Sequence, residues 1–285
     1  MRKFIVFLLF CLSAGLCYYA TRPAKHPNRP PINTTQQTQQ AAKTTNPLTA
    51  LGEKLDKTED NKTEILPALL PPQTAWPKPV SAVWGAYNMK NATKAKIGSG
   101  NWVSLGKIPQ NMVTALISVE DHRFYEHNGV DFDGILRAIL VNIQEDGIVQ
   151  GASTLTQQLV KNNLLSDQRS MERKVFEAAL ALMVEGRFSK EDILEMYLNT
   201  TYFGAGATGI KAAASTYFGK EPSQLSLAEC ATLAGLPNAP SALNPYENPE
   251  GCKKRRNLVL SLMGKRGYLQ PSEVQKAIAQ PLTLR

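Results

Sequence analysis

The residues whose types and spacing could do chemistry are concentrated in two stretches of the sequence. The first, residues 120–129, reads Glu-Asp-His-Arg-Phe-Tyr-Glu-His-Asn-Gly and places Glu120 at the end of an apolar run. The second, residues 151–162, is a polar stretch that ends in Lys161 and Asn162. A carboxylate that emerges from an apolar helix is partly buried, which raises its pKa and makes it a usable base. The two stretches together predict a site that removes a proton at one end and holds an anion at the other.

Each stretch also has a plainer interpretation. Glu120 could simply lie at a helix end, where it would form a cap or a salt bridge. If the helix instead continued past Glu120, Phe124 and His127 would lie on the same helix face as Glu120. A helix over residues 153–162 would gather polar side chains in one sector, which suits a phosphate or a sugar but could also be a solvated outer face. Its start, at Ser153, would offer free N–H groups to an anion. The polar sector consists of Thr154, Gln157, Gln158, Lys161 and Asn162.

A third block places Arg173 and Glu177 four positions apart, where a helix would bring their side chains together. The plainer interpretation is a surface ion pair of small energetic value. The alternative is a site in which Arg173 holds an anionic leaving group while Glu177 orients a sugar or a cation.

The elements that would position these residues are helices. From Pro109 onward the apolar residues recur with a helical period, and Ser170, Ser189 and Ser226 are predicted N-caps. A short hairpin is expected around residues 80–103. The fold class is therefore mainly α. Helices are expected over residues 112–119, 135–143, 153–165, 170–187, 190–200, 207–217, 226–235, 252–266 and 272–280.

Length and charge limit the classes of function. The 285 residues could form one or two domains, and the net charge of +8 is unevenly spread. Residues 1–80 carry 10 Lys and Arg against 5 Asp and Glu, whereas residues 81–285 carry 22 against 19. The nearly balanced second part argues against a nucleic-acid groove built on bulk charge. The four cysteines show neither metal-ligand spacing nor a disulfide pattern.

The N-terminal part is predicted to be an anchor and a linker. Residues 4–20 are an uncharged run behind Arg2 and Lys3, and we expect residues 1–20 to be an uncleaved transmembrane anchor, with a cleaved signal peptide as the alternative. Residues 21–80 are rich in Pro, Thr, Gln and Asn, and are expected to be a disordered linker. The catalytic domain would then comprise residues 81–285.

Taken together, these blocks resemble the glycosyltransferase domain of class A penicillin-binding proteins and the monofunctional peptidoglycan glycosyltransferases, that is, glycosyltransferase family 51. Glu120 and Glu177 match the family's two essential carboxylates. The chain departs from the family pattern at Ala205, where a larger residue is common, and at Leu243, where tyrosine is usual. The matching blocks are residues 120–129, 151–162, 173–185, 193–210, and 217–220 with 233–245.

The resemblance implies a lysozyme-like α fold with a smaller, membrane-apposed lobe. The substrate would be lipid II, a disaccharide-pentapeptide on undecaprenyl pyrophosphate, and Glu120 would be the general base for the acceptor's 4-hydroxyl. Lys161 and Arg173 would stabilise the departing pyrophosphate, and Glu177 would orient the donor or bind a divalent cation, Mg²⁺ or Mn²⁺. No other cofactor is expected. Further contacts are expected from Ser153, Gln158 and Asn162 to the donor, and from Arg123, Phe124 and His127 beside Glu120.

The expected location follows from this substrate: the bacterial cytoplasmic membrane, with the catalytic domain on its periplasmic or extracellular side. Partners would be lipid II, the growing glycan chain, the membrane and other cell-wall synthesis proteins, and no nucleic acid. Some apolar residues between the first two blocks, such as Ile135, Leu136, Ile139 and Ile143, could face lipid. The Lys-Thr-Gly motif of transpeptidases is absent, which predicts glycan polymerisation without cross-linking. The alternatives are a lytic transglycosylase and an inactive homologue that recruits cell-wall machinery.

Overall fold

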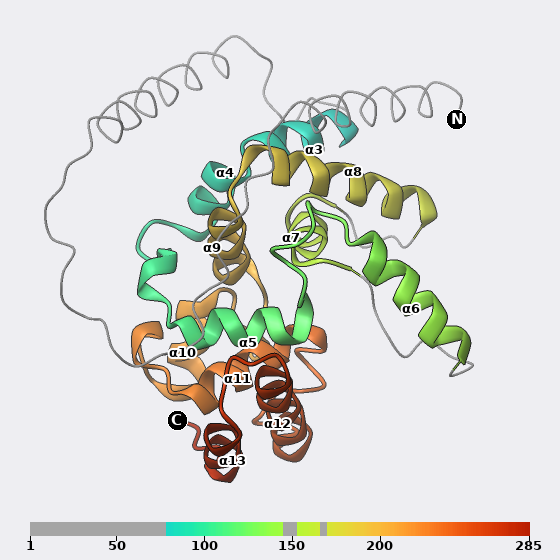
Figure 1. Cartoon of the computed structure of the whole chain (residues 1–285). Coiled ribbons are helices and arrows are strands. Elements are labelled where there is room, and N and C mark those ends of the chain that lie inside the picture. Colours follow the sequence, from blue (N-terminus) through green and yellow to red (C-terminus); the bar gives the residue numbers. More distant parts are fainter. Residues whose placement is uncertain (1–77, 145–152, 166–169) are drawn as a thin grey trace, which may run out of the picture. The chain divides into compact units, whose positions relative to one another are not determined.

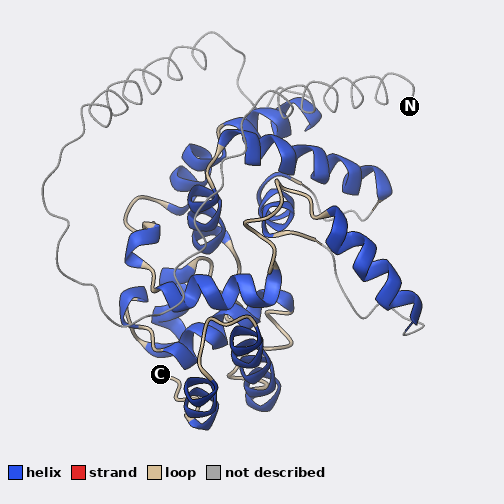
Figure 2. Cartoon of the chain, in the orientation of Figure 1, coloured by secondary structure: helices blue, strands red, loops and turns tan. Residues whose placement is uncertain are grey.

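The computed structural model describes residues 78–144, 153–165 and 170–285, and these residues form helices joined by loops (Figures 1 and 2). One isolated antiparallel bridge joins Tyr202 and Thr208. The described residues from Gly85 onward lie in one compact unit, and residues 78–84 fall in a second one. The helices are α3 (Lys78–Tyr87), α4 (Met89–Ile97), η2 (Leu105–Lys107), α5 (Gln110–Glu120), α6 (Phe132–Gln144), α7 (Leu155–Leu164), α8 (Met171–Arg187), α9 (Lys190–Thr200), α10 (Ile210–Phe218), η3 (Pro222–Gln224), α11 (Leu227–Gly235), η4 (Leu236–Asn238), α12 (Pro249–Lys265) and α13 (Pro271–Ala279).

The mainly α prediction is confirmed, including the predicted helix starts. The Ser170 side chain caps α8, and Ser189 and Ser226 form capping boxes with Asp192 and Glu229 at the starts of α9 and α11. Each hydroxyl accepts a backbone N–H that the first helical turn leaves without a partner. These caps account for the close agreement between predicted and observed helix starts.

The predicted hairpin around residues 80–103 is wrong, because α3 and α4 cover most of this stretch. The buried residues Ala86, Met89 and Thr93 are three and four positions apart, which is the period of a helix and not of a strand. The Thr93 hydroxyl donates to the Met89 carbonyl at 2.6 Å, so its polar group is satisfied within α4.

Two helices of the core position the site. In α5 every residue from Met112 to Ser118 is buried, and the helix packs against α11 and α12 (Figure 1). α7 packs against α8 and α9. The predicted site residues lie at the end of α5 and just after it, just before and along α7, and in the first two turns of α8.

The predicted anchor at residues 1–20 and most of the linker at residues 21–80 lie outside the described residues. The predicted boundary between residues 80 and 81 falls inside α3. No helix in the described part of the chain combines the length and the apolar character that crossing a membrane requires.

Candidate active site

Glu120 is the last residue of α5, and its side chain is only 8% exposed. One carboxylate oxygen accepts a hydrogen bond from Gln158 Nε2 of α7 at 3.0 Å. The other lies 3.4 Å from Arg255 Nη2 of α12. The carboxylate is therefore held from two sides by helices that lie far apart in the sequence.

Burial raises the pKa of Glu120 above its ordinary value and outweighs the hydrogen bond from Gln158 and the positive charges of Arg255 and Lys161, which act in the opposite direction. A carboxylate with a raised pKa is a stronger base than an exposed one, and general bases of this kind are found at catalytic sites. The environment of Glu120 therefore suits proton removal.

The raised pKa of Glu120 also predicts a pH dependence of stability. A carboxyl group whose pKa is higher in the folded state favours folding while it is protonated; this contribution is full below the ordinary glutamate pKa and is lost as pH rises through the folded-state value. Glu120→Gln mimics the protonated form, so it should melt like the unmodified protein in acid and at a higher temperature near neutral pH. Each 1 kcal/mol of difference corresponds to about 2–4 °C. Thermal melts across this pH range check the prediction, and a gap that does not grow with pH would contradict it.

Asp121, the next residue, ties the end of α5 to the start of α7. Its carboxylate accepts from His127 Nε2 at 3.0 Å and from the backbone N–H of Leu155 at 2.9 Å. The Thr154 hydroxyl donates to the Gly129 carbonyl at 2.6 Å, which closes the same junction from the other side. Gln158 is thereby held at a fixed place relative to Glu120.

Because α5 ends at Glu120, the helix does not continue, and the condition under which Phe124 and His127 would share a helix face with Glu120 is not met. Phe124 is fully buried and His127 is 7% exposed, so both support the site from below its surface. Lys190 Nζ lies 4.3 Å from the Phe124 ring centroid and donates to the His127 carbonyl at 2.7 Å. Arg123 forms ion pairs with three carboxylates, those of Glu126, Asp131 and Asp133.

The start of α7 does not offer the free anion site that the sequence predicted. Asp121 takes the Leu155 N–H, and the Thr154 hydroxyl takes the Gln157 N–H in a capping box. Thr154 and Gln157 are therefore buried cap residues and not members of a ligand-facing polar sector. Within the same sector Gln158 faces Glu120, while Lys161 and Asn162 are exposed.

Lys161 is an accessible cation close enough to Glu120 to lower its pKa. Its side chain forms no hydrogen bond or ion pair with any residue in the described ranges, whereas most other basic side chains in the site have an acidic or carbonyl partner. An ammonium group without a protein partner is available to an anionic ligand.

Glu177 is the centre of a second group of charges on α8. Its side chain is 1% exposed, one oxygen lies 2.5 Å from Lys174 Nζ, and the other lies 3.9 Å from Arg173 Nη1. That second oxygen and Arg173 Nε are buried without a hydrogen-bond partner among the described residues. Lys174 Nζ also donates to the Ser153 hydroxyl at 2.8 Å, next to the α7 cap. Two cations are thus fixed around one buried carboxylate beside the start of α7.

The predicted option of a divalent cation at Glu177 fits these residues poorly. One carboxylate with two cations beside it is already neutralised, while a hard cation prefers several oxygen ligands. In residues 78–144, 153–165 and 170–285 no group of three or more His, Cys, Asp or Glu is placed to hold a metal ion. No step proposed below uses a metal.

Three residues of the site were missed in the sequence. Arg255 approaches Glu120 across 135 positions, and no local pattern indicates such a pairing. The sequence analysis assigned no role to Lys174, although both Lys174 and its neighbour Arg173 form ion pairs with Glu177. The fully buried Tyr197 donates to Gln158 Oε1 at 3.0 Å, which orients the amide so that its NH₂ group faces Glu120.

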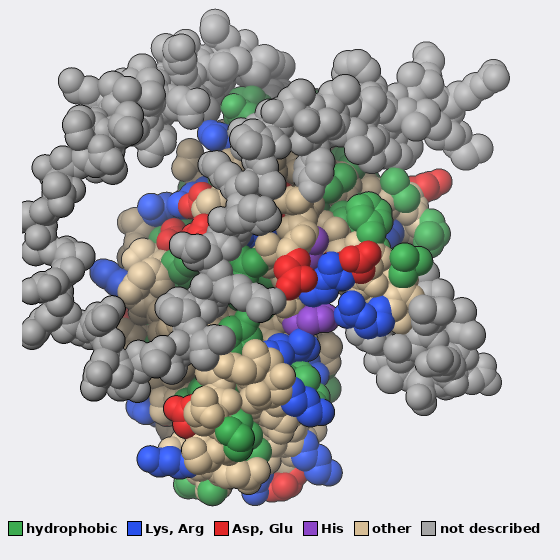
Figure 3. All heavy atoms as spheres, in the orientation of Figure 1, with side chains coloured by type: hydrophobic (Ala, Val, Ile, Leu, Met, Phe, Trp, Pro, Cys, Tyr) green, Lys and Arg blue, Asp and Glu red, His purple; other side chains and the backbone are tan. Residues whose placement is uncertain are grey.

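Charged side chains gather with histidine on one face of the molecule (Figure 3).

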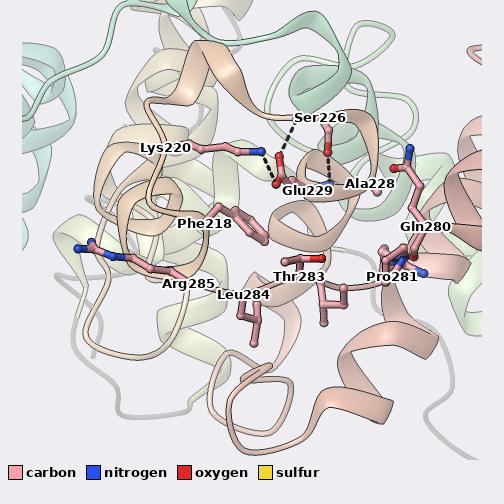
Figure 4. A pocket seen from close by; sticks show the side chains of 12 residues that line it. Phe218, Lys220, Ser226, Ala228, Glu229, Gln280, Pro281, Thr283, Leu284 and Arg285 are labelled. Atoms are coloured by element: carbon pink, nitrogen blue, oxygen red, sulfur yellow. Dashed lines mark hydrogen bonds and ion pairs between the residues drawn. The ribbon is translucent and has the colours of Figure 1, made fainter.

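A separate cavity of about 440 Å³ lies at the C-terminal end of the chain (Figure 4). Glu229, which accepts from Lys220 Nζ at 2.7 Å and pairs with Ser226, lines it together with residues 280–285. None of the site residues predicted from the sequence lines this cavity.

Comparisons with known proteins identify the family of this chain. A family model described as Transglycosylase matches residues 89–264, which include all the candidate site residues. Penicillin-binding protein 1A of Aquifex aeolicus is 45% identical over 201 residues, covering 70% of this chain and 28% of that protein. A predicted transglycosylase of Cupriavidus necator is 44% identical over 185 residues, covering 65% of this chain and 80% of that protein. The crystal structure of penicillin-binding protein 1A from Haemophilus influenzae is 26% identical, with a TM-score of 0.40, over 65% of this chain and 18% of that one.

A helical domain that a transglycosylase model matches over residues 89–264 defines the class of protein. The chain belongs to the transglycosylase family, glycosyltransferase family 51. It spans 28% of the length of the Aquifex penicillin-binding protein.

Proposed function

We propose that this chain polymerises glycan strands from lipid II. One observation carries the proposal: a buried carboxylate with a raised pKa, Glu120, lies at one end of the site, and cations lie on the neighbouring helices. These cations are Lys161, Arg173 and Lys174. Gln158 of α7 contacts Glu120, and Ser153, just before α7, contacts Lys174, so this one helix connects both groups.

In the proposed reaction Glu120 takes the proton from the 4-hydroxyl of the acceptor sugar. The hydroxyl oxygen attacks C1 of the sugar that ends the growing chain, and a new C1–O bond forms with inversion. The bond from C1 to the lipid diphosphate breaks, and its electron pair leaves with the diphosphate. Lys161, Arg173 and Lys174 would stabilise the developing negative charge, and each such preorganised donor typically contributes about 3 kcal/mol.

Glycan cleavage by a lytic transglycosylase fits the charges less well. Hydrolytic and lytic sites act on a neutral glycosidic bond, whose leaving group is not a diphosphate. A group of cations would have no leaving anion to stabilise in such a site. Here three basic side chains lie at or beside α7 and α8, and Lys161 has no acidic partner among the described residues. An inactive homologue is disfavoured because Glu120 and Glu177 match the two essential carboxylates of the family that the chain resembles.

The assay that tests the proposal mixes the purified protein with labelled lipid II, with and without a phosphoglycolipid inhibitor of the family. We expect polymer that the inhibitor suppresses, and no cleavage of finished glycan. Release of anhydro-sugar fragments from finished glycan, without use of lipid II, would select the lytic alternative. We also expect no covalent labelling by penicillin, since the sequence holds no Lys-Thr-Gly motif.

We further propose that the catalytic domain touches the outer side of the cytoplasmic membrane, where lipid II is held. On α6 Phe132 and Leu136 are 68% and 62% exposed and lie one turn apart. Ile135 is half-buried, and the side chains of Ile139 and Ile143 lie outside the described set. Exposed apolar side chains at this spacing are typical of a helix that lies in a membrane interface.

The change Phe132→Ser with Leu136→Ser should weaken binding of a fragment of residues 78–285 to liposomes. Each apolar side chain contributes about 1.5–3 kcal/mol when buried, so the pair should change the dissociation constant by at least about 100-fold. Liposome sedimentation measures it. Leu258→Ser, which removes an apolar residue that is 46% exposed on α12, is the matched control and should bind normally. Equal binding by both variants would contradict a lipid-facing α6.

A further inference from the structure

Three basic side chains form a second cluster beside Glu120: His122, Arg137 and Arg266. Arg137 Nη1 of α6 lies 3.2 Å from His122 Nε2. Arg266, the residue after α12, donates from Nε to the Ser118 carbonyl of α5 at 3.1 Å. His122 and Ser118 stand two positions on either side of Glu120, so chain connectivity keeps the cluster close to the proposed base.

The cluster brings together charges of one sign. Burial is the largest cause that lowers the pKa of His122, and the positive charges of Arg266 and Arg137 lower it further. The negative charges of Asp121 and Asp131 act in the opposite direction. Burial lowers the pKa of Arg266, Tyr268 opposes this effect, and the positive charge of Arg137 lowers the pKa further. The Asp121 carboxylate already accepts hydrogen bonds from His127 and from the Leu155 N–H. The Asp131 carboxylate accepts the Gly134 N–H and forms an ion pair with Arg123. No carboxylate in the described part of the chain forms an ion pair with Arg137 or Arg266.

Both guanidinium groups belong to exposed residues, so a ligand can reach them. Guanidinium groups recognise phosphate through paired, charge-assisted hydrogen bonds, and a neutral histidine can donate one more. Grouped like charges that have no protein counter-ion are best explained by an anion that joins them during function.

We propose that His122, Arg137 and Arg266 bind the diphosphate of the acceptor substrate. This inference rests on the proposed function, in which two lipid-linked substrates meet and each carries a diphosphate. The diphosphate that leaves would lie at Lys161, Arg173 and Lys174, on α7 and α8. The diphosphate that stays on the acceptor needs its own cations near Glu120, because the same molecule must present its 4-hydroxyl to that carboxylate. The second cluster comes from α6, from the turn after α5 and from the end of α12, and supplies these cations.

The test measures formation of a single bond between a lipid-linked tetrasaccharide donor and two acceptors, one with a diphosphate and one with a monophosphate. In the double variant Arg137→Gln, Arg266→Gln, KM for the diphosphate acceptor should rise roughly 10-fold or more for each lost guanidinium. KM for the donor should stay unchanged, and the preference for diphosphate over monophosphate should disappear. Lys265→Gln removes an exposed neighbouring charge and should behave like the unmodified protein.

The outcomes separate this inference from the proposed function. If the unmodified protein forms no bond from any donor, the proposed function fails. If it forms bonds and the double variant keeps its acceptor KM and its preference, the cluster does not bind the acceptor diphosphate. The single variant Arg137→Gln serves as a second measurement should the double variant melt early.

The same phosphate chemistry could come from anionic membrane lipids, so the assay is run both in neutral detergent and in vesicles with phosphatidylglycerol. We expect the loss in acceptor KM in both. A loss that appears only with the anionic vesicles would assign the cluster to lipid headgroups and overturn the proposal.

Discussion

Replacing Glu120 by glutamine is expected to reduce chain growth on lipid II by about 10²- to 10⁴-fold, the usual contribution of a general base. The amide keeps the size of the side chain, and its oxygen can still accept the hydrogen bond from Gln158, so the local structure should survive. What it loses is the ability to accept a proton from the 4-hydroxyl. The rate of single-bond formation with saturating donor and acceptor measures the effect.

Two controls make this result specific to Glu120. Glu191→Gln removes an exposed carboxylate from α9 and should leave the rate unchanged. Lipid-linked substrate should bind the Glu120 variant about as tightly as the unmodified protein, because the lost function belongs to the transition state and not to the ground state. A Glu120→Gln protein with near-normal turnover would rule out the base assignment.

Replacing Glu177 by glutamine should lower the rate by about 100-fold, the usual cost of losing one preorganised electrostatic group. Glu177 orients Lys174 at 2.5 Å and has Arg173 at 3.9 Å, so the change releases both cations that we assign to the leaving diphosphate. The expected signature is a lower kcat with a smaller change in KM, since the charge on the diphosphate develops as the bond breaks. Steady-state kinetics with varied lipid II separates the two constants.

Glu172→Gln is the matched control for Glu177, because it removes an exposed carboxylate from the first turn of the same helix. Breaking a buried ion pair typically costs about 3–5 kcal/mol, and less here because the Lys174 side chain is 43% exposed. A thermal melt therefore has to show that the Glu177 variant is folded at the assay temperature. A folded variant with unchanged kcat would mean that Glu177 has no part in the chemistry.

Local patterns predicted much of the fold. Helix period and serine caps indicated α8, α9 and α11 with starts close to those observed, because caps and amphipathic spacing are local properties. The stretch at residues 80–103 was missed because its small and polar residues carry little periodicity. Only the burial of Ala86, Met89 and Thr93 shows the helical face.

The site was predicted in outline but not in its connections. The sequence indicated Glu120, Gln158 and Glu177, but it could not show that Gln158 bonds directly to Glu120 or that Arg255 approaches from α12. Such pairings depend on tertiary packing across many residues. The sequence also misassigned the start of α7, because its polar residues look the same whether they cap a helix or bind a ligand. Asp121 decides this, by accepting the Leu155 N–H that an anion would otherwise take.

The dependence of the single-bond rate on pH tests the central claim most directly. With saturating substrates the unmodified protein should show a rate that rises with pH through one titration, whose midpoint lies above the ordinary glutamate pKa because Glu120 is buried. The residual rate of the Glu120→Gln protein should lack that titration. If the variant keeps the same rise at the same midpoint, another group accepts the proton, and the role proposed for Glu120 is wrong.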